Sequence, residues 1–131
     1  MTLVDSNVIL DLVTAEERWL EWSSGHLTKA ADSGPVAINP VIFAECAYGY
    51  TDIADLLSDL PVGMELLPLP YEAAFLAGKA FAGYRRLCGK RERILGDFYV
   101  GAHAQVAGLT LLTRDAARYR TYFPKIKLIA P

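Results

Sequence analysis

Short apolar segments alternate along the chain with longer segments in which apolar residues repeat at helical spacing. After residue 52, for example, they follow the i, i+3, i+4, i+7 spacing of an amphipathic helix, at Ile53, Leu56, Leu57 and Leu60. The short segments have the length of buried strands and are Thr2–Asp5, Val36–Ile38, Glu65–Leu69, Leu109–Thr113 and Lys127–Ile129. This alternation predicts an α/β fold, in which helices flank a short, central and mostly parallel β-sheet.

Helices are expected between these strands, because the intervening segments carry residues that favour helix starts and ends. Asn39-Pro40, for instance, places a capping side chain before a proline at the first helical position. After a helical start at Val8, the predicted helices are Glu16–Asp32, Val41–Tyr48, Ile53–Leu60, Tyr71–Leu87, Asp97–Gly108 and Ala116–Tyr122. In the helix from Asp97, the residues Asp97, Gly101, Ala104 and Gly108 share one face, which is small enough for another element to approach closely.

Length and composition exclude several classes of protein. The 131 residues predict one domain over residues 1–131, and the apolar fraction of 53% is enough for a core. The longest stretch without Asp, Glu, Lys or Arg is Phe98–Thr113, which at 16 residues is too short to span a membrane. Two cysteines and two histidines cannot form a disulfide framework or a four-ligand zinc site, and no basic patch precedes the first apolar run. We therefore predict a cytoplasmic protein without membrane contact.

Charge is divided unevenly along the chain. Residues 1–75 contain 12 acidic and 2 basic residues, whereas residues 76–131 contain 3 acidic and 11 basic residues. The basic part could form a surface that binds an anionic polymer, or the two parts could simply attract each other in the folded protein. Charge alone does not choose between these interpretations.

Four carboxylates stand where parallel strands are expected to end or helices to begin. They are Asp5, Glu45, Asp97 and Asp115. Ligands of open α/β sheets collect beyond the carboxyl ends of the strands. Each aspartate could instead cap a helix, and Glu45, the only charge between Val36 and Thr51, could pair with a buried arginine.

Carboxylates that converge at one sheet edge repel each other, by ~1 kcal/mol per pair at ~4 Å in water and ~4 kcal/mol at an effective dielectric constant of 20. A divalent cation removes this cost, and oxygen ligands without His or Cys favour Mg²⁺ or Mn²⁺ over zinc. Such an ion activates water and neutralises phosphodiester charge. The carboxylates therefore indicate metal-dependent phosphoryl chemistry.

The motifs that carry these carboxylates resemble those of PIN-domain ribonucleases, and most closely the VapC-type toxins of toxin–antitoxin modules. They are Val4-Asp5-Ser6-Asn7-Val8-Ile9-Leu10-Asp11, the lone Glu45, Gly96-Asp97-Phe98-Tyr99-Val100-Gly101-Ala102-His103-Ala104 and Leu112-Thr113-Arg114-Asp115. The resemblance spans nearly the whole chain and implies a single PIN-like domain. It implies that Asp5, Glu45, Asp97 and Asp115 hold Mg²⁺ or Mn²⁺, supported by the polar residues Ser6, Asn7 and Thr113.

The same resemblance implies an antitoxin that binds and inhibits the protein, and a homodimer. Trp19 and Trp22 lie three positions apart; such a pair is usually part of the core, but if exposed it could anchor the antitoxin. Some family members have a further acid after the last motif, whereas this chain has Arg118 and Tyr119 there, so a fifth acidic ligand is not expected.

Basic residues cluster just before Asp97. We interpret them, together with Arg114, as phosphate contacts to RNA: Arg85, Arg86, Lys90, Arg91, Arg93 and Arg114. The alternative is an ordinary solvated face. His103 is six positions from Asp97, which places it poorly for a ligand, so we interpret it as structural or RNA-facing.

The sequence thus predicts a metal-dependent endoribonuclease toxin, in which a metal-activated water attacks an RNA phosphodiester. A haloacid-dehalogenase-type phosphatase needs a second Asp two residues after the first, where this chain has Asn7. A receiver domain is excluded because Asp52 does not follow a strand-like segment. The alternative from another class is a catalytically silent PIN-like module that binds RNA or another protein.

Overall fold

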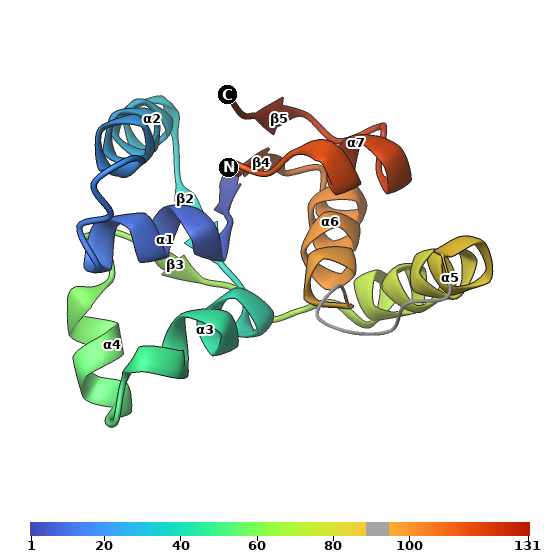
Figure 1. Cartoon of the computed structure of the whole chain (residues 1–131), viewed down its shortest axis with the longest axis horizontal. Coiled ribbons are helices and arrows are strands. Elements are labelled where there is room, and N and C mark those ends of the chain that lie inside the picture. The colour runs from blue at the N-terminus through green and yellow to red at the C-terminus, as the bar shows by residue number, and fades with distance from the viewer. Residues whose placement is uncertain (89–94) are drawn as a thin grey trace.

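The short apolar segments form one parallel sheet, as predicted (Figure 1). The computed structural model describes residues 1–88 and 95–131. Within them the strand order is β3-β2-β1-β4-β5, and every strand pair is parallel. The bounds of the strands are β1 Thr2–Val4, β2 Val36–Ile38, β3 Glu65–Leu66, β4 Thr110–Leu112 and β5 Leu128–Ile129. Because all strands run in one direction, the residues that follow β1, β2 and β4 meet at the same edge of the sheet.

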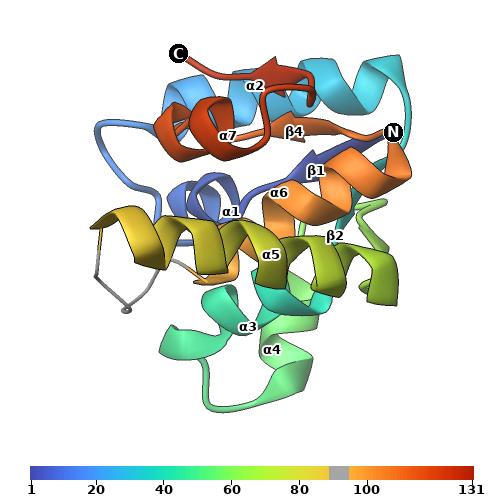
Figure 2. The same cartoon turned by 90° about the vertical axis from the view of Figure 1, so that its right-hand side faces the viewer.

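Helices cover both faces of this sheet. Their bounds are α1 Ser6–Val13, α2 Leu20–Ser33, α3 Pro40–Cys46, α4 Ile53–Asp59, α5 Tyr71–Cys88, α6 Leu95–Ala107 and α7 Ala117–Tyr122, with a 3-10 turn at Ala47–Gly49. In Figure 1 the strands lie between α1 and α2 on one side and α6 on the other. Helix α5 packs along α6 and is the outermost element on that side in Figure 2. No helix of the described residues is long and apolar enough to cross a membrane.

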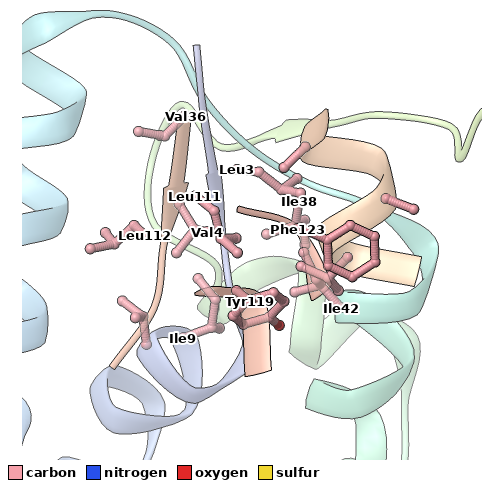
Figure 3. Close-up of a cluster of buried hydrophobic side chains, with 14 of the residues drawn as sticks. Leu3, Val4, Ile9, Val36, Ile38, Ile42, Leu111, Leu112, Tyr119 and Phe123 are labelled. Atoms are coloured by element: carbon pink, nitrogen blue, oxygen red, sulfur yellow. The ribbon is translucent and has the colours of Figure 1, made fainter. Parts of the chain in front are cut away.

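The core combines aliphatic side chains of the central strands and of the surrounding helices with aromatic side chains, among them Phe98 of α6 and Tyr119 of α7. Figure 3 shows Leu3 and Val4 of β1 packed with Leu111 and Leu112 of β4, and Tyr119 of α7 at the same cluster. All five side chains are fully or almost fully buried. Burial of this kind supplies most of the stability of such a fold, at roughly 25 cal/mol per Å² of apolar surface.

The small face predicted on α6 is present and does bring another element close. A Cβ atom added at Gly101 would lie 2.4 Å from Cδ2 of Phe123, the residue that follows α7. The glycine therefore lets the Phe123 ring lie directly against α6. This contact fixes α7 beside the sheet edge where β1 and β4 end.

The start of the second helix differs from its prediction. We expected a helix from Glu16, but α2 begins at Leu20, because the chain turns at Ala15, whose φ is 49°. The Glu16 carboxylate then accepts a hydrogen bond from the Trp19 backbone N–H at 2.7 Å. A polar side chain in the connection thus supplies a capping contact that helical periodicity does not indicate.

Candidate functional site

Asp5 follows the central strand and is the most buried of the four predicted carboxylates, with 3% of its surface exposed. Its Oδ1 accepts the Ser6 backbone N–H at 2.8 Å, so it caps α1. Its Oδ2 accepts the Thr113 hydroxyl at 2.8 Å and lies 3.1 Å from the Tyr119 hydroxyl. Burial raises the pKa of Asp5, and the charge of Asp97 raises it further, although these hydrogen bonds act in the opposite direction. The helix cap and the proposed site role therefore coexist in one residue.

Glu45 reaches the same edge from α3. Burial raises the pKa of Glu45, as do the charges of Asp5 and Asp97, while a hydrogen bond from the Ser6 side chain lowers it. A Cβ atom placed on Gly96 would lie 2.3 Å from Glu45 Oε1, so only glycine leaves this space for the carboxylate. The sequence interpretation that Glu45 pairs with a buried arginine finds no support in the described residues, where no ion pair of Glu45 is present.

Asp97 lies in the first turn of α6 and contacts two residues of α7. Its Oδ2 forms an ion pair with the Arg118 guanidinium, and its Oδ1 lies 3.5 Å from the Tyr119 hydroxyl. Burial raises the pKa of Asp97, Arg118 lowers it, and the charge of Asp115 raises it. The Tyr119 hydroxyl is thus placed between Asp5 and Asp97. Burial and these two carboxylates raise its pKa well above the usual value, so it remains a protonated donor.

Asp115 is the exposed member of the four, and its charge acts on the pKa of Asp97. Its backbone N–H donates to Thr113 Oγ1 at 3.1 Å. Asp115 does not cap α7, whose N-cap is Ala116. The structure therefore brings Asp5, Glu45 and Asp97 into mutual electrostatic contact and leaves Asp115 at the rim.

The three polar residues predicted to support the carboxylates do contact them. Thr113 is completely buried and bridges Asp5 to the backbone of Asp115. The Asn7 side-chain amide lies 3.3 Å from Asp5 and 3.2 Å from Thr113, and its oxygen accepts the Arg114 backbone N–H at 3.3 Å. Ser6 contacts two of the carboxylates, because its backbone N–H donates to Asp5 and its side chain forms a hydrogen bond with Glu45.

The donor set fits a hard divalent cation in its chemistry, because it offers only carboxylate oxygens and hydroxyls. The space that Gly96 leaves at Glu45 is also consistent with a ligand position. With the side chains as they stand, however, no three Asp, Glu, His or Cys residues among 1–88 and 95–131 are grouped closely enough to hold a metal ion. In this arrangement the Asp97 carboxylate is paired with Arg118, and the Asp5 carboxylate accepts a hydrogen bond from Tyr119.

The helices that carry Glu45 and Asp97 are tied together by a contact that sequence reasoning missed. Asn39 caps α3 by accepting the Ile42 N–H at 2.9 Å, and its amide nitrogen donates to His103 Nδ1 at 3.0 Å. His103 belongs to α6 and is 2% exposed, and burial lowers its pKa, so the ring is neutral. Of the two sequence interpretations of His103, the structure therefore supports the structural one. A capping asparagine next to a proline was the only local signal.

Arg114, which we predicted to contact RNA, has its guanidinium engaged elsewhere. It forms two hydrogen bonds to Asp11, at 2.9 and 3.1 Å, and lies 5.3 Å from the centre of the Trp19 ring. Asp11 is 1% exposed and also accepts the Ser23 hydroxyl at 2.6 Å. The side chain of Arg114 thus connects the segment after β4 to α1 and α2.

The remaining predicted RNA contacts are only partly described. Arg85 and Arg86 are exposed in the last turn of α5, whereas Lys90, Arg91 and Arg93 lie outside the described residues. Trp19 and Trp22 are both half-buried, with ring centres 6.1 Å apart. Trp22 packs against the core and stacks on His26, so the pair is neither fully internal nor fully exposed.

Comparison with known proteins gives a family and a fold. The sequence model of the PIN domain family matches residues 2–124. Among curated proteins no match to the chain is found. Among the solved structures that resemble the chain is a toxin–antitoxin complex from Klebsiella pneumoniae, with a TM-score of 0.62 and 19% identity, over 98% of this chain and 96% of that chain.

A chain of VapBC2 from Rickettsia felis, bound to a promoter DNA fragment, has a TM-score of 0.73 and 17% identity, with 99% of this chain and 98% of that chain covered. DNA-bound VapBC from Salmonella typhimurium has a TM-score of 0.70 and 18% identity, with 98% of this chain and 96% of that chain covered. FitAcB from Neisseria gonorrhoeae has a TM-score of 0.62 and 21% identity, with the same shares of the two chains covered, 98% and 96%. At these identities the likeness concerns the fold.

Proposed function

Because this chain belongs to the PIN domain family, whose model matches residues 2–124, we propose that it is the nuclease toxin of a toxin–antitoxin module, a metal-dependent endoribonuclease. The observation that carries the proposal is the group of Asp5, Glu45 and Asp97 at one sheet edge. Each has a raised pKa, and each of the three stands in electrostatic contact with another member of the group. Carboxylates that destabilise one another in this way gain most from a shared cation.

Asp5, Glu45 and Asp97 would hold Mg²⁺ or Mn²⁺, with Asp115 at the rim. The chemistry that such an ion supplies when bound is neutralisation of phosphate charge and acidification of a water molecule. Thr113, Ser6 and Asn7 orient the carboxylates through the hydrogen bonds described above. Tyr119, which keeps its proton, has one hydroxyl hydrogen to donate, and its oxygen lies 3.1 Å from Asp5 Oδ2 and 3.5 Å from Asp97 Oδ1.

RNA would be held by cations near α5 and α6. Arg85 and Arg86 are exposed and therefore available to phosphates, and Lys90, Arg91 and Arg93 extend the same basic stretch in the sequence. Arg114 is left out of this surface, since its guanidinium binds Asp11. Replacing Arg85 and Arg86 with Gln should reduce the salt dependence of RNA binding by one to two units of slope, about one per phosphate contact.

The partners follow from the relatives rather than from this chain alone. One structural relative is a toxin–antitoxin complex from Klebsiella pneumoniae, and by likeness to it we propose a cognate antitoxin for this protein. The homodimer is proposed from the family resemblance. The half-buried Trp19 and Trp22 remain a proposed contact of the antitoxin. Co-expression with the product of a neighbouring short reading frame, followed by size-exclusion chromatography, tests both proposals.

A second candidate function is a catalytically silent module that binds RNA or protein. The ion pair between Arg118 and Asp97 is the observation that favours it, because it places a cation of the protein where a metal ligand is proposed. Cleavage assays distinguish the two candidates.

The test uses purified protein, free of antitoxin, and a structured RNA with Mg²⁺ or Mn²⁺. We expect cleavage that stops with EDTA, and a loss of at least about 100-fold in Asp5→Asn and in Asp97→Asn. Glu17→Gln, a change at an exposed position between α1 and α2, is the matched control and should cleave as the unchanged protein does. Undiminished cleavage by both aspartate variants would remove these residues from the site, and absence of cleavage with intact RNA binding would favour the silent module.

A further inference from the structure

The sheet edge with the carboxylates already contains one cation of the protein. Arg118 of α7 forms an ion pair with Asp97 Oδ2, and the side chains of Arg118 and Asp97 are 32% and 29% exposed. The pair therefore lies at the mouth of the site, with water on one side and Asp5 and Glu45 on the other. The family motifs described above do not include this arginine.

The next residue extends the same contact. The Tyr119 hydroxyl lies 3.1 Å from Asp5 and 3.5 Å from Asp97, on the Asp97 oxygen that Arg118 does not use. Consecutive residues of α7 thus supply a positive charge and a hydroxyl to two carboxylates that would otherwise face each other unscreened. The helix is held in this position by Phe123, which lies on Gly101 of α6.

We propose that Arg118 is a resident counter-cation of this site, which a divalent metal ion must displace from Asp97 in order to bind. The inference rests on the proposed metal-dependent function. The metal ion and the guanidinium are both cations that bind the Asp97 carboxylate, and they repel each other at this distance, so each weakens the binding of the other to the same extent. Because Arg118 is partly exposed, its long side chain can move into water when the metal ion binds.

The proposal predicts two effects of opposite sign. Without the guanidinium, the carboxylates repel each other more strongly, so the metal-free protein becomes less stable. The metal ion then meets no competitor at Asp97, so it binds more tightly. An arginine with a merely structural role gives the first effect without the second.

The experiment measures binding of Mn²⁺ alone by isothermal titration calorimetry. The matched control is Arg120→Gln, which removes the same charge from an exposed position two residues further along α7. We expect Arg118→Gln to bind Mn²⁺ about fivefold to tenfold more tightly than the unchanged protein. Arg120→Gln and the charge-conserving Arg118→Lys should stay within about twofold. In EDTA, Arg118→Gln should melt a few degrees lower than Arg120→Gln.

Weaker or unchanged Mn²⁺ binding by Arg118→Gln would overturn the proposal, as would equal tightening in Arg120→Gln, which indicates a diffuse effect of net charge. If Arg118→Gln fails to fold, Arg118→Ala replaces it, with Arg120→Ala as its control and the same tightening expected. Absence of Mn²⁺ binding in the unchanged protein, or binding that persists in Asp5→Asn, would instead overturn the metal site and the proposed function with it. The two failures are therefore distinguishable.

Discussion

Helix α1 has a buried aspartate at each end, and the two are treated differently by the fold. Asp11 is 1% exposed and is neutralised by two hydrogen bonds from Arg114 and one from Ser23. Asp5 is 3% exposed and, among the residues that the structure describes, accepts hydrogen bonds from neutral groups only, while Asp97 and Glu45 add further negative charge nearby. The charge of Asp11 is compensated by a cation of the protein, whereas the charge of Asp5 is not compensated by the described residues.

This difference separates a structural carboxylate from one that is available for function. A buried charge is tolerated when a cation and hydrogen bonds compensate for lost hydration. Asp11 meets this condition within the protein. Within residues 1–88 and 95–131, Asp5 has the hydrogen bonds but no cation, and its pKa is raised because burial disfavours the charged carboxylate. Asp5, the N-cap of α1, is therefore the carboxylate of this pair that we propose to bind a cation.

The largest expected effect is on stability and concerns Asp11. Asp11→Asn should lower the free energy of unfolding by about 2–3 kcal/mol, because Arg114 loses its charged partner. Asp5→Asn, measured in EDTA at pH 7, should change it by no more than about 1 kcal/mol, since the Tyr119 hydroxyl can rotate to accept from the new amide and the side-chain oxygen can still cap α1. Urea denaturation of both variants checks this, and equal losses would break the comparison.

A smaller effect is expected in the pH dependence of the metal-free protein. The raised pKa of Glu45 means that the folded state holds its proton to higher pH than the unfolded chain does. The contribution is fully present below the unfolded pKa, near 4, and is lost as pH rises through the folded pKa. Glu45→Gln should therefore match the unchanged protein near pH 4 and exceed its stability by about 1 kcal/mol at pH 8.

Buried His103 acts in the opposite direction, because its lowered pKa costs stability as pH falls below about 6.5. Because His103 is present in both Glu45→Gln and the unchanged protein, the difference between their free energies of unfolding reports the effect of Glu45. Denaturation curves in EDTA at several pH values supply the measurement, with Glu17→Gln as the control for loss of one exposed charge. A stability difference that does not grow with pH would contradict the repulsion at this edge.

The smallest effect on stability, but a clear one on function, is expected at Gly96. Gly96→Ala places a methyl group where Glu45 Oε1 now lies, so the flexible carboxylate must move. Alanine favours the helix by up to ~1 kcal/mol, which should keep stability within about 1 kcal/mol of the original. Mn²⁺ affinity and RNA cleavage should fall by about tenfold.

The matched variant is Gly78→Ala in α5, where an added Cβ has no neighbour within 4 Å. It should gain helix stability and leave both activities unchanged. If Gly96→Ala behaves in the same way, the space beside Glu45 has no part in the site.

The elements of this fold could be predicted because each has a local pattern. Apolar runs indicated the strands, and the i, i+3, i+4, i+7 spacing at Ile53–Leu60 indicated α4, which the structure ends at Asp59. The common edge of Asp5 and Asp115 followed from the parallel arrangement, since they come after β1 and β4 and Thr113 links them. Asp97 lies in the first turn of α6 rather than after one of these strands, so its place beside Asp5 did not follow from the strands. Caps were informative too, as Asn39 does begin α3.

The side-chain contacts that complete the site could not be predicted in this way. Arg118 with Asp97, Arg114 with Asp11, and Tyr119 with Asp5 join residues 21, 103 and 114 positions apart. Such partners depend on how α7 is set against α6 and leave no periodic signal. Sequence reasoning therefore did not indicate the Asp11 partner of Arg114 and assigned no role to Arg118 or Tyr119, which lie three and four residues after Asp115.

The central position of β1 also determines when the carboxylate edge can first exist during synthesis. Thr2–Val4 emerge from the ribosome more than a hundred residues before β4 and Tyr119 do. Until then Asp5 lacks both Thr113 and Tyr119, and the sheet lacks the strand that carries Asp115 to it. A chain that has not yet reached β4 and α7 has no assembled carboxylate edge, so under the proposed function it cannot yet cleave RNA.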